Sequence, residues 1–149
     1  MTPEAERYLA KARLTLAHAR KMLTVQPTED AGRAAYLAGF HAAQAPIFER
    51  TGAVTKTHKG AHMEFARLTR DEPGVEIALR RFLPQAYDLK ALCDYELGPD
   101  AVVPFEKAAA AVECAARFVD CISRLVDSKN VAPQCSTSSC LPKGNRKRR

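Results

Sequence analysis

The fold is decided by the stretch Ala34-Ala35-Tyr36-Leu37-Ala38-Gly39-Phe40-His41-Ala42-Ala43-Gln44-Ala45. It contains no charged residue, and as a helix it is apolar around most of its circumference. A helix of this kind must be surrounded by others, so the stretch predicts the central helix of a bundle. Gly39, which lacks a side chain, is expected to let a neighbouring element approach closely. Pro46 follows, and because proline removes a helical hydrogen bond we expect a bend near residues 42–46.

Helical patterns also lie on both sides of this stretch. Thr2 followed by Pro3 predicts a capped helix that runs to about residue 25, while Thr28 and Gly52 predict the start and end of the central helix. Apolar residues recur at three- and four-residue steps in the segments 56–68, 75–95 and 104–127. The sequence therefore predicts an all-α, up-and-down bundle of about five helices, in one domain that spans residues 1–128.

The chain carries a net charge of +6, and its basic excess lies at one end. Six of the 23 Lys and Arg residues fall in residues 129–149, which contain no acidic residue. The other 17 basic residues lie in residues 1–128 and equal the 17 acidic ones in number, so the bundle itself is formally neutral. The poor apolar content of residues 129–149 predicts a disordered basic tail, which we interpret as a solubilising end rather than a nucleic-acid-binding arm.

The five cysteines predict no metal site. Cys135 and Cys140 in the tail have no second pair of ligands nearby, and Cys114 and Cys121, seven residues apart on one helix, are expected to be small core residues. No apolar run approaches the ~20 residues needed to cross a bilayer, and the acidic start of the sequence does not resemble a signal peptide. We therefore expect a cytoplasmic protein without a cofactor, a metal or a membrane partner.

Three segments occur in a recognisable order. They are residues 34–43 of the stretch quoted above, Lys56-Thr57-His58-Lys59-Gly60, and Asp88-Leu89-Lys90-Ala91-Leu92-Cys93-Asp94-Tyr95. Together they resemble the small prokaryotic HEPN-domain proteins, in which a "YYAxFHAA" helix is followed by "KTHxG" and later by "LRxxADY". The resemblance covers about residues 30–125.

The resemblance implies a helical bundle that commonly forms a homodimer. It also implies a partner, a minimal nucleotidyltransferase (MNT), within toxin–antitoxin or related defence systems. Many members of the family are metal-independent ribonucleases, whose signature is an Arg followed four to six residues later by a His at the dimer cleft.

This sequence departs from that signature. Lys90 stands where the resemblance implies the Arg, Asp94 and Tyr95 stand where it implies the His, and no histidine occurs after residue 62. Lys90, Asp94 and Tyr95 are the candidate catalytic residues, although Lys90 and Asp94, four residues apart, also fit an ordinary ion pair. Without a histidine the usual general acid or base near neutral pH is missing. In this family a tyrosine at this place can accept a nucleotide from the partner, which makes Tyr95 a candidate acceptor.

Candidate ligand-binding residues lie earlier in the chain. His58, between Lys56 and Lys59, stands at the start of a predicted helix, where free backbone N–H groups favour a phosphate. The alternative is that Thr57 caps this helix and His58 packs over the loop. His41 lies on the central helix, where a core or interface role is expected and a binding or catalytic role is the alternative. His62 is expected on the surface.

These observations lead to one functional prediction and one alternative. We predict a HEPN-domain interaction module that pairs with an MNT-type nucleotidyltransferase, binds RNA or nucleotides through His58, Lys59 and Lys90, and carries a degenerate nuclease motif. The alternative is an active metal-independent ribonuclease toxin with a non-standard site made of Lys90, Asp94 and Tyr95 with His41. Whether the protein is an enzyme stays open between them.

Overall fold

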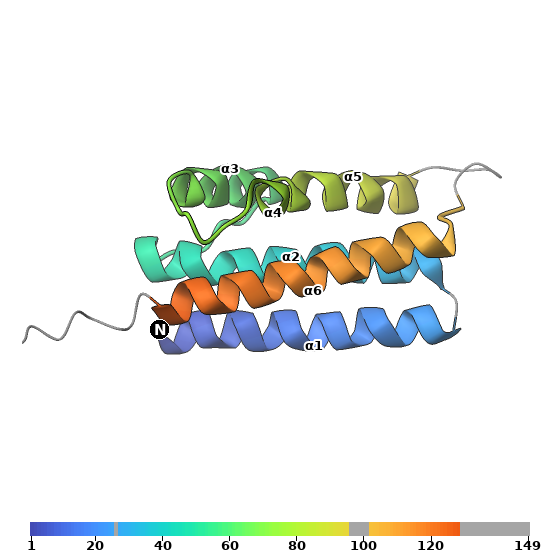
Figure 1. Ribbon diagram of the computed structural model, residues 1–149, viewed down its shortest axis with the longest axis horizontal. Helices are drawn as coiled ribbons and strands as arrows, with labels where there is room; N and C mark the ends of the chain where they lie inside the picture. Colours follow the sequence, from blue (N-terminus) through green and yellow to red (C-terminus); the bar gives the residue numbers. More distant parts are fainter. Residues whose placement is uncertain (26, 96–101, 129–149) are drawn as a thin grey trace, which may run out of the picture.

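The computed structural model describes residues 1–25, 27–95 and 102–128, and over these residues the chain is all-α, which confirms the predicted fold class. Its helices are α1 (Pro3–Val25), α2 (Thr28–Thr51), α3 (His58–Thr69), α4 (Ile77–Arg80), α5 (Phe82–Tyr95) and α6 (Phe105–Ser128). The long helices α1, α2 and α6 run side by side, and α3, α4 and α5 form a second layer along them (Figure 1).

Two further predictions concern the C-terminal tail and membrane-spanning segments. The predicted tail, residues 129–149 with Cys135 and Cys140, lies outside the described residues. Within the part of the chain that the structure describes, no helix is both long enough and apolar enough to span a membrane.

Helix α2 is the central helix, as predicted, because it packs against α1, α3, α5 and α6. Its buried positions are mostly small residues: Ala31, Gly32, Ala34, Ala35, Ala38, Gly39, Ala42, Ala43 and Ala45. Small side chains let neighbouring helices approach to the short end of the usual interaxial range of about 8–10 Å. The alanine-rich composition of α2 therefore produces a thin, dense centre for the bundle.

Helix α1 packs on α2 and α6 through a regular pattern. Its buried residues alternate between alanine and leucine at steps of four and three: Ala5, Leu9, Ala12, Leu16 and Ala19. At its start, the backbone N–H and the hydroxyl of Thr2 both donate to Glu49 Oε2 at 2.8 Å. Further along, Arg13 Nη2 donates to Ser123 Oγ of α6 at 2.9 Å. The apolar repeat of α1 is thus accompanied by polar contacts at Thr2 and at Arg13.

Two of the three predicted helix ends, Thr2 and Gly52, are confirmed, and so is the cap at Thr57 that was the alternative for the next helix. The Ala5 N–H donates to Thr2 Oγ1 (3.3 Å) at the start of α1, and the Gly60 N–H donates to Thr57 Oγ1 (3.0 Å) at the start of α3. Gly52 ends α2 with φ +68°, a conformation that glycine adopts without strain. The cap predicted at Thr28 is wrong: Thr28 is already inside α2, and its hydroxyl donates to Glu29 rather than to the backbone.

The interior prolines have different surroundings. Pro46 is buried inside α2, which continues past it to Thr51, and the expected bend near residues 42–46 stays a prediction. The segment predicted as one helix over residues 75–95 is divided at Arg81 into α4 and α5. Pro84 therefore falls in the first turn of α5, where the missing N–H of proline has no helical partner to lose.

The core is organised around three phenylalanine rings. Phe118 of α6 lies 5.0 Å from Phe82 of α5 and 5.2 Å from Phe65 of α3, measured between ring centroids. Phe82 also lies against the backbone of α2, because a Cβ placed on Gly39 would stand 2.3 Å from Phe82 Cε1. The close approach expected at Gly39 is thus confirmed. Cys121 is buried as predicted, but Cys114 is exposed, so its assignment to the core was wrong.

We predict that Gly39→Ala lowers the free energy of unfolding by about 1–3 kcal/mol, because the added methyl group overlaps the Phe82 ring. In an open helix the same change would raise stability by up to about 1 kcal/mol. Urea unfolding followed by circular dichroism measures the difference. Gly74→Ala is the matched control, since a Cβ there meets nothing within 4 Å; equal stability of the two variants would contradict the prediction.

Candidate functional site

Five rings from three helices meet beside the centre of the bundle, and we name them the Tyr–His cluster: Tyr36 and Phe40 of α2, His58 and His62 of α3, and Tyr87 of α5. The Tyr36 hydroxyl lies 2.8 Å from His58 Nδ1 and 2.9 Å from His62 Nε2. Tyr36 itself is 0% exposed. A fully buried hydroxyl is thus shared by two imidazoles.

Helical spacing explains why these rings meet. Tyr36 and Phe40 are four residues apart on α2, and His58 and His62 are four apart on α3, so each pair projects from one side of its helix. The cap at Thr57 starts α3 so that His58 is its first residue. Tyr87 closes the cluster, with its ring centroid 5.4 Å from that of His58 and 5.6 Å from that of His62.

The protonation of the cluster follows from its burial. A hydroxyl has one hydrogen, so Tyr36 donates to one imidazole and accepts an N–H bond from the other. Burial lowers the pKa of His58 and His62; Lys90 lowers that of His58 further, while for His62 the nearby His58 lowers it and Asp88 opposes the shift. Burial raises the pKa of Tyr36. At pH 7 the cluster therefore consists of two neutral imidazoles and a protonated tyrosine.

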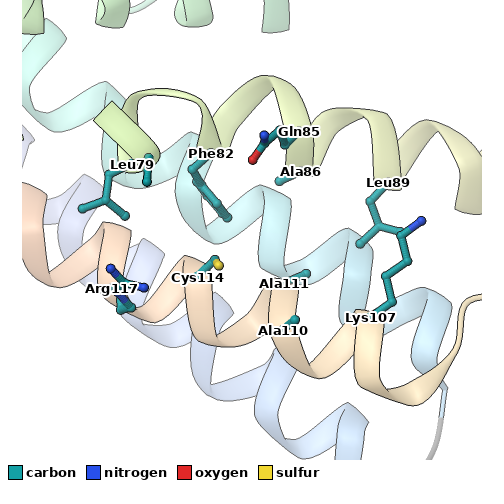
Figure 2. Close-up of a pocket in the computed structure, with 11 residues that line it drawn as sticks. Leu79, Phe82, Gln85, Ala86, Leu89, Lys107, Ala110, Ala111, Cys114 and Arg117 are labelled. Atoms are coloured by element: carbon teal, nitrogen blue, oxygen red, sulfur yellow. The ribbon is translucent and has the colours of Figure 1, made fainter. Parts of the chain in front are cut away.

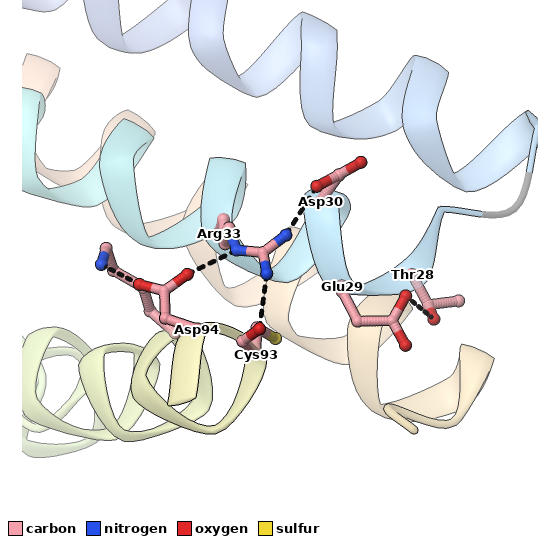
Figure 3. Close-up of polar contacts among 7 residues, drawn as sticks. Thr28, Glu29, Asp30, Arg33, Cys93 and Asp94 are labelled. Carbon is pink, nitrogen blue, oxygen red and sulfur yellow. Dashed lines mark hydrogen bonds and ion pairs between the residues drawn. The ribbon is translucent and has the colours of Figure 1, made fainter. Parts of the chain in front are cut away.

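A second group, which we name the ion cluster, joins α2 to α5 and consists of Asp30, Arg33, Lys90 and Asp94. Arg33 Nε donates to Asp94 Oδ1 (2.5 Å), and Arg33 Nη1 donates to Asp30 Oδ1 (2.7 Å), as Figure 3 shows. Arg33 also donates to the backbone oxygen of Cys93, and Lys90 donates to Asp94. The guanidinium of Arg33 is thus fixed by three acceptors.

The charges of this group determine what each member can do. Lys90 and then Arg33 lower the pKa of the Asp94 carboxyl, and the bond to Asp94 raises the pKa of Arg33. Asp94 is therefore held ionised and engaged by two cations, which makes it a poor proton acceptor at neutral pH. The ion cluster therefore supplies two fixed cations, Arg33 and Lys90, rather than a group that accepts and releases protons.

Lys90 connects the two clusters, because its charge acts on His58 as well as on Asp94. The Tyr–His cluster and the ion cluster together join α2, α3 and α5, and we call the two clusters together the α2–α3–α5 face. It offers neutral imidazoles beside Arg33 and Lys90. Such a combination can hold a phosphate through the cations and exchange a proton through an imidazole.

The structure distributes the predicted site residues unequally. Lys90, Asp94 and His58 come together on the α2–α3–α5 face. Lys56 and Lys59 are exposed beside the start of α3, and Tyr95 is 77% exposed at the end of α5. His41 lies at the edge of the Tyr–His cluster, with its ring 5.8 Å from that of Phe40, and burial, followed by the charge of Lys11 of α1, lowers its pKa to about 4. The site therefore brings His58, rather than His41, into interaction with Lys90.

Sequence reasoning missed six members of this face: Asp30, Arg33, Tyr36, Phe40, His62 and Tyr87. The surface position expected for His62 was wrong, because its ring is partly buried and bonded to Tyr36. One signal was present in the sequence: His58 and His62 have the four-residue spacing that places two side chains on one side of a helix. Arg33 had no such signal, since its partner Asp94 is 61 residues away.

A groove of about 230 Å³ lies apart from this face, between α4 and α5 on one side and α6 on the other (Figure 2). Its lining is mainly apolar and consists of Ala78, Leu79, Phe82, Gln85, Ala86, Leu89, Lys107, Ala110, Ala111, Cys114 and Arg117. No imidazole or carboxylate is among these residues, so the groove is suited to contact with an apolar surface rather than to acid–base chemistry. Over residues 1–25, 27–95 and 102–128 we find no group of three or more His, Cys, Asp or Glu placed to hold a metal.

We predict that Tyr36→Phe lowers the free energy of unfolding by about 1–3 kcal/mol, because it leaves two partly buried imidazoles without their shared partner. Tyr87→Phe serves as the control: its ring belongs to the same cluster, but its hydroxyl makes no hydrogen bond within the described residues, and we expect a change of less than about 0.5 kcal/mol. Urea denaturation of both variants checks this. A loss as large for Tyr87→Phe as for Tyr36→Phe would assign the effect to ring packing instead.

Comparison with known proteins identifies the family. No curated protein matches the sequence. The crystal structure of TT1696 from Thermus thermophilus is similar to this chain, with a TM-score of 0.66 and 22% sequence identity, over 83% of this chain and 98% of that chain. At this identity the similarity shows a shared fold. The HEPN domain family matches residues 5–125, which confirms the resemblance carried by the three motifs, and the chain belongs to the HEPN domain family.

Proposed function

We propose that this HEPN-domain protein is an interaction module that pairs with an MNT-type nucleotidyltransferase in a toxin–antitoxin or defence-like system and binds RNA or nucleotide phosphates on its α2–α3–α5 face. The observation that carries the proposal is the convergence of Arg33, Lys90 and His58 on that face, although the three residues come from three different helices. Cations beside partly exposed aromatic rings are the usual elements of single-stranded nucleic-acid binding.

Two features support an interaction role over catalysis. Lys90 and Arg33 are both engaged by Asp94, and the low pKa of that carboxyl leaves it unsuited to accept a proton at neutral pH. The groove between α5 and α6 supplies an apolar surface on a different side of α5, which suits a second copy of this chain or the partner enzyme. The module would thus use one face for phosphates and another for protein.

Tyr95 is the proposed acceptor of a nucleotide from the partner. It stands at the last position of α5, one residue after Asp94, and its 77% exposure makes the hydroxyl accessible to a second enzyme. Asp94, the residue before Tyr95, is bonded to both Arg33 and Lys90. Two cations therefore lie near the end of α5, where they can attract the phosphates of the donor nucleotide.

We expect intact-mass spectrometry to show one added nucleotide after incubation with ATP, Mg²⁺ and a purified MNT-type nucleotidyltransferase. Tyr95→Phe should abolish the gain in mass, because it removes the only acceptor oxygen of that side chain and leaves the ring in place. Tyr87→Phe, a change of the same kind at a partly buried position, should leave it intact. An unmodified wild-type protein, or a modified Tyr95→Phe variant, would rule out Tyr95 as the acceptor.

The second candidate function is a metal-independent ribonuclease, and one observation favours it. The family signature lacks its Arg and its His on α5, yet Arg33 of α2 and His58 of α3 bring the same two kinds of group to Lys90 and Asp94. The pKa of His58 is lowered, so its imidazole is neutral at pH 7 and able to accept a proton. The non-standard site would then be Lys90, Asp94 and Tyr95 with His58 in place of His41.

Incubation of the purified protein with end-labelled tRNA in EDTA separates the two candidates, with RNA binding measured in parallel by fluorescence anisotropy. The interaction module predicts binding without cleavage. The ribonuclease predicts cleavage that falls by about 10²–10⁴-fold in His58→Ala and is unchanged in His41→Ala, which lies outside the α2–α3–α5 face. Cleavage unaffected by His58→Ala, Lys90→Ala and Asp94→Ala would exclude this face as a nuclease site.

A further inference from the structure

The hydroxyl of Tyr36 limits how many protons the Tyr–His cluster can hold. With both imidazoles neutral, one ring donates an N–H bond to the oxygen of Tyr36, and the hydroxyl of Tyr36 donates to the other ring. Each of the three polar groups then has its partner. The Tyr36 hydroxyl is then satisfied both as a donor and as an acceptor, and its two bonds fasten the start of α3 to α2.

One added proton does not disturb this arrangement. A protonated imidazole donates through both ring nitrogens, so it donates to Tyr36, and Tyr36 still donates to the remaining neutral ring. The charged ring is then the donor to the Tyr36 oxygen, and the neutral ring accepts from the Tyr36 hydroxyl. The two hydrogen bonds of 2.8 and 2.9 Å thus survive the first protonation.

A second proton breaks the arrangement. Both rings are then donors, and the hydrogen of the Tyr36 hydroxyl has no acceptor in the cluster. Water cannot supply one at a side chain that is 0% exposed, so a polar hydrogen is left buried without a partner. Two positive rings also converge on a single oxygen, and their repulsion adds to this cost.

Charged and titratable groups face the cluster from each of the helices packed around it. From α2 the ring partner is Tyr36, and Arg33 of that helix is bound to Asp30 and Asp94; α3 presents His58 and His62 themselves. From α5 the facing groups are Tyr87, Asp88 and Lys90. Asp88 favours a charge on His62 and Lys90 disfavours one on His58. A charge on His58 also lowers the pKa of His62, so a proton on one ring disfavours a proton on the other.

Other anchors of α3 do not involve the imidazoles: Ala61 is buried in the core in its first half, and further anchors lie in its second half. Phe65 packs against Phe118 of α6, and Arg50 of α2 donates to the Leu68 oxygen and pairs with Glu72 at 2.5 Å. These contacts hold residues 65–72 whatever the charge on His58 and His62. Opening caused by the second proton is therefore confined to the first turns of α3.

We propose that residues 58–62 of α3 form an acid-sensitive latch, which is closed while the His58–Tyr36–His62 set carries at most one added proton and opens from α2 and α5 when it takes up the second. The latch carries His58, so its opening would remove that imidazole from the α2–α3–α5 face and move the neighbouring Lys59 with it. It does not depend on the function proposed for that face.

The sign of the pH dependence follows from the directions of the shifts. Both histidines have a pKa below the 6.5 of an ordinary histidine, so the closed latch binds fewer protons than the open one. The stability of the closed state is therefore fully present above about pH 6.5 and is lost as the pH falls through the lowered pKa values.

Hydrogen–deuterium exchange of the full chain, compared at about pH 7.5 and about pH 5 after correction for intrinsic exchange rates, tests the latch. We expect amides 61–66 to exchange at least about 10-fold faster at the lower pH, while amides of α6 keep their protection. The double variant His58→Gln/His62→Gln should lose this difference, because glutamine does not titrate. His18→Gln, at an exposed histidine of α1, and His41→Gln, at the half-buried one, are matched controls that should retain it.

Three results would overturn the proposal: equal exchange of α3 at both pH values, an equal rise in α6 that marks global unfolding, or a pH effect that persists in the double variant. If the double variant does not fold, a histidine NMR titration of the wild-type protein replaces it. Two separate protonation steps, with the α3 amide shifts following the second, support the latch. A single step, or amide shifts that follow the first, contradict it.

Discussion

The contact between the Phe82 ring and the backbone of α2 at Gly39 is the constraint on which the rest of the bundle depends. It requires a residue without a side chain at one point of the central helix, since a Cβ there would stand 2.3 Å from the ring. The same ring packs on Phe118, which packs on Phe65, so a single line of aromatic rings joins α5, α6 and α3 to α2. The position of Phe82 also sets where the rest of α5 lies, and with it Tyr87, Lys90 and Asp94.

The α2–α3–α5 face results from the close packing of α5 against α2. Helix α2 supplies Arg33 and Tyr36, one turn apart, and α5 lies close enough for each to find a partner on it or on α3. Lys90 is the member common to both clusters, because it bonds Asp94 and acts on His58. A change at Lys90 therefore alters the charge of the ion cluster and the proton affinity of the Tyr–His cluster together.

Much of the fold was predictable because local rules determine it. The caps at Thr2 and Thr57, the left-handed Gly52 and the central position of α2 all follow from residues close together in the chain. The cap predicted at Thr28 was wrong because α2 already includes Thr28 and follows directly on Pro27. The burial predicted for Cys114 was wrong because a groove stays open between α5 and α6 at that residue. Both errors concern how neighbouring segments pack.

The site was less predictable for the same reason. His58, Lys90 and Asp94 were recognised from their motifs, whereas Arg33 and Tyr36 acquire their roles only through partners 22 to 61 residues away. A single sequence carries no sign of such pairings when the residues lie on different helices. The alternative site that combined His41 with Lys90 is an example. The charge of Lys11 of α1 acts on His41, whereas the charge of Lys90 acts on His58.

The alternating alanines and leucines of α1 leave its translation along the bundle undetermined. A shift by seven residues, about 10 Å along the helix axis, would again place Ala5 and Leu9 where Ala12 and Leu16 now lie. Apolar burial alone distinguishes such sliding states weakly. The bonds from Thr2 to Glu49 and from Arg13 to Ser123 form in one of them only. Two partly buried polar contacts, each of modest strength, thereby select one alignment of α1 from several of nearly equal packing.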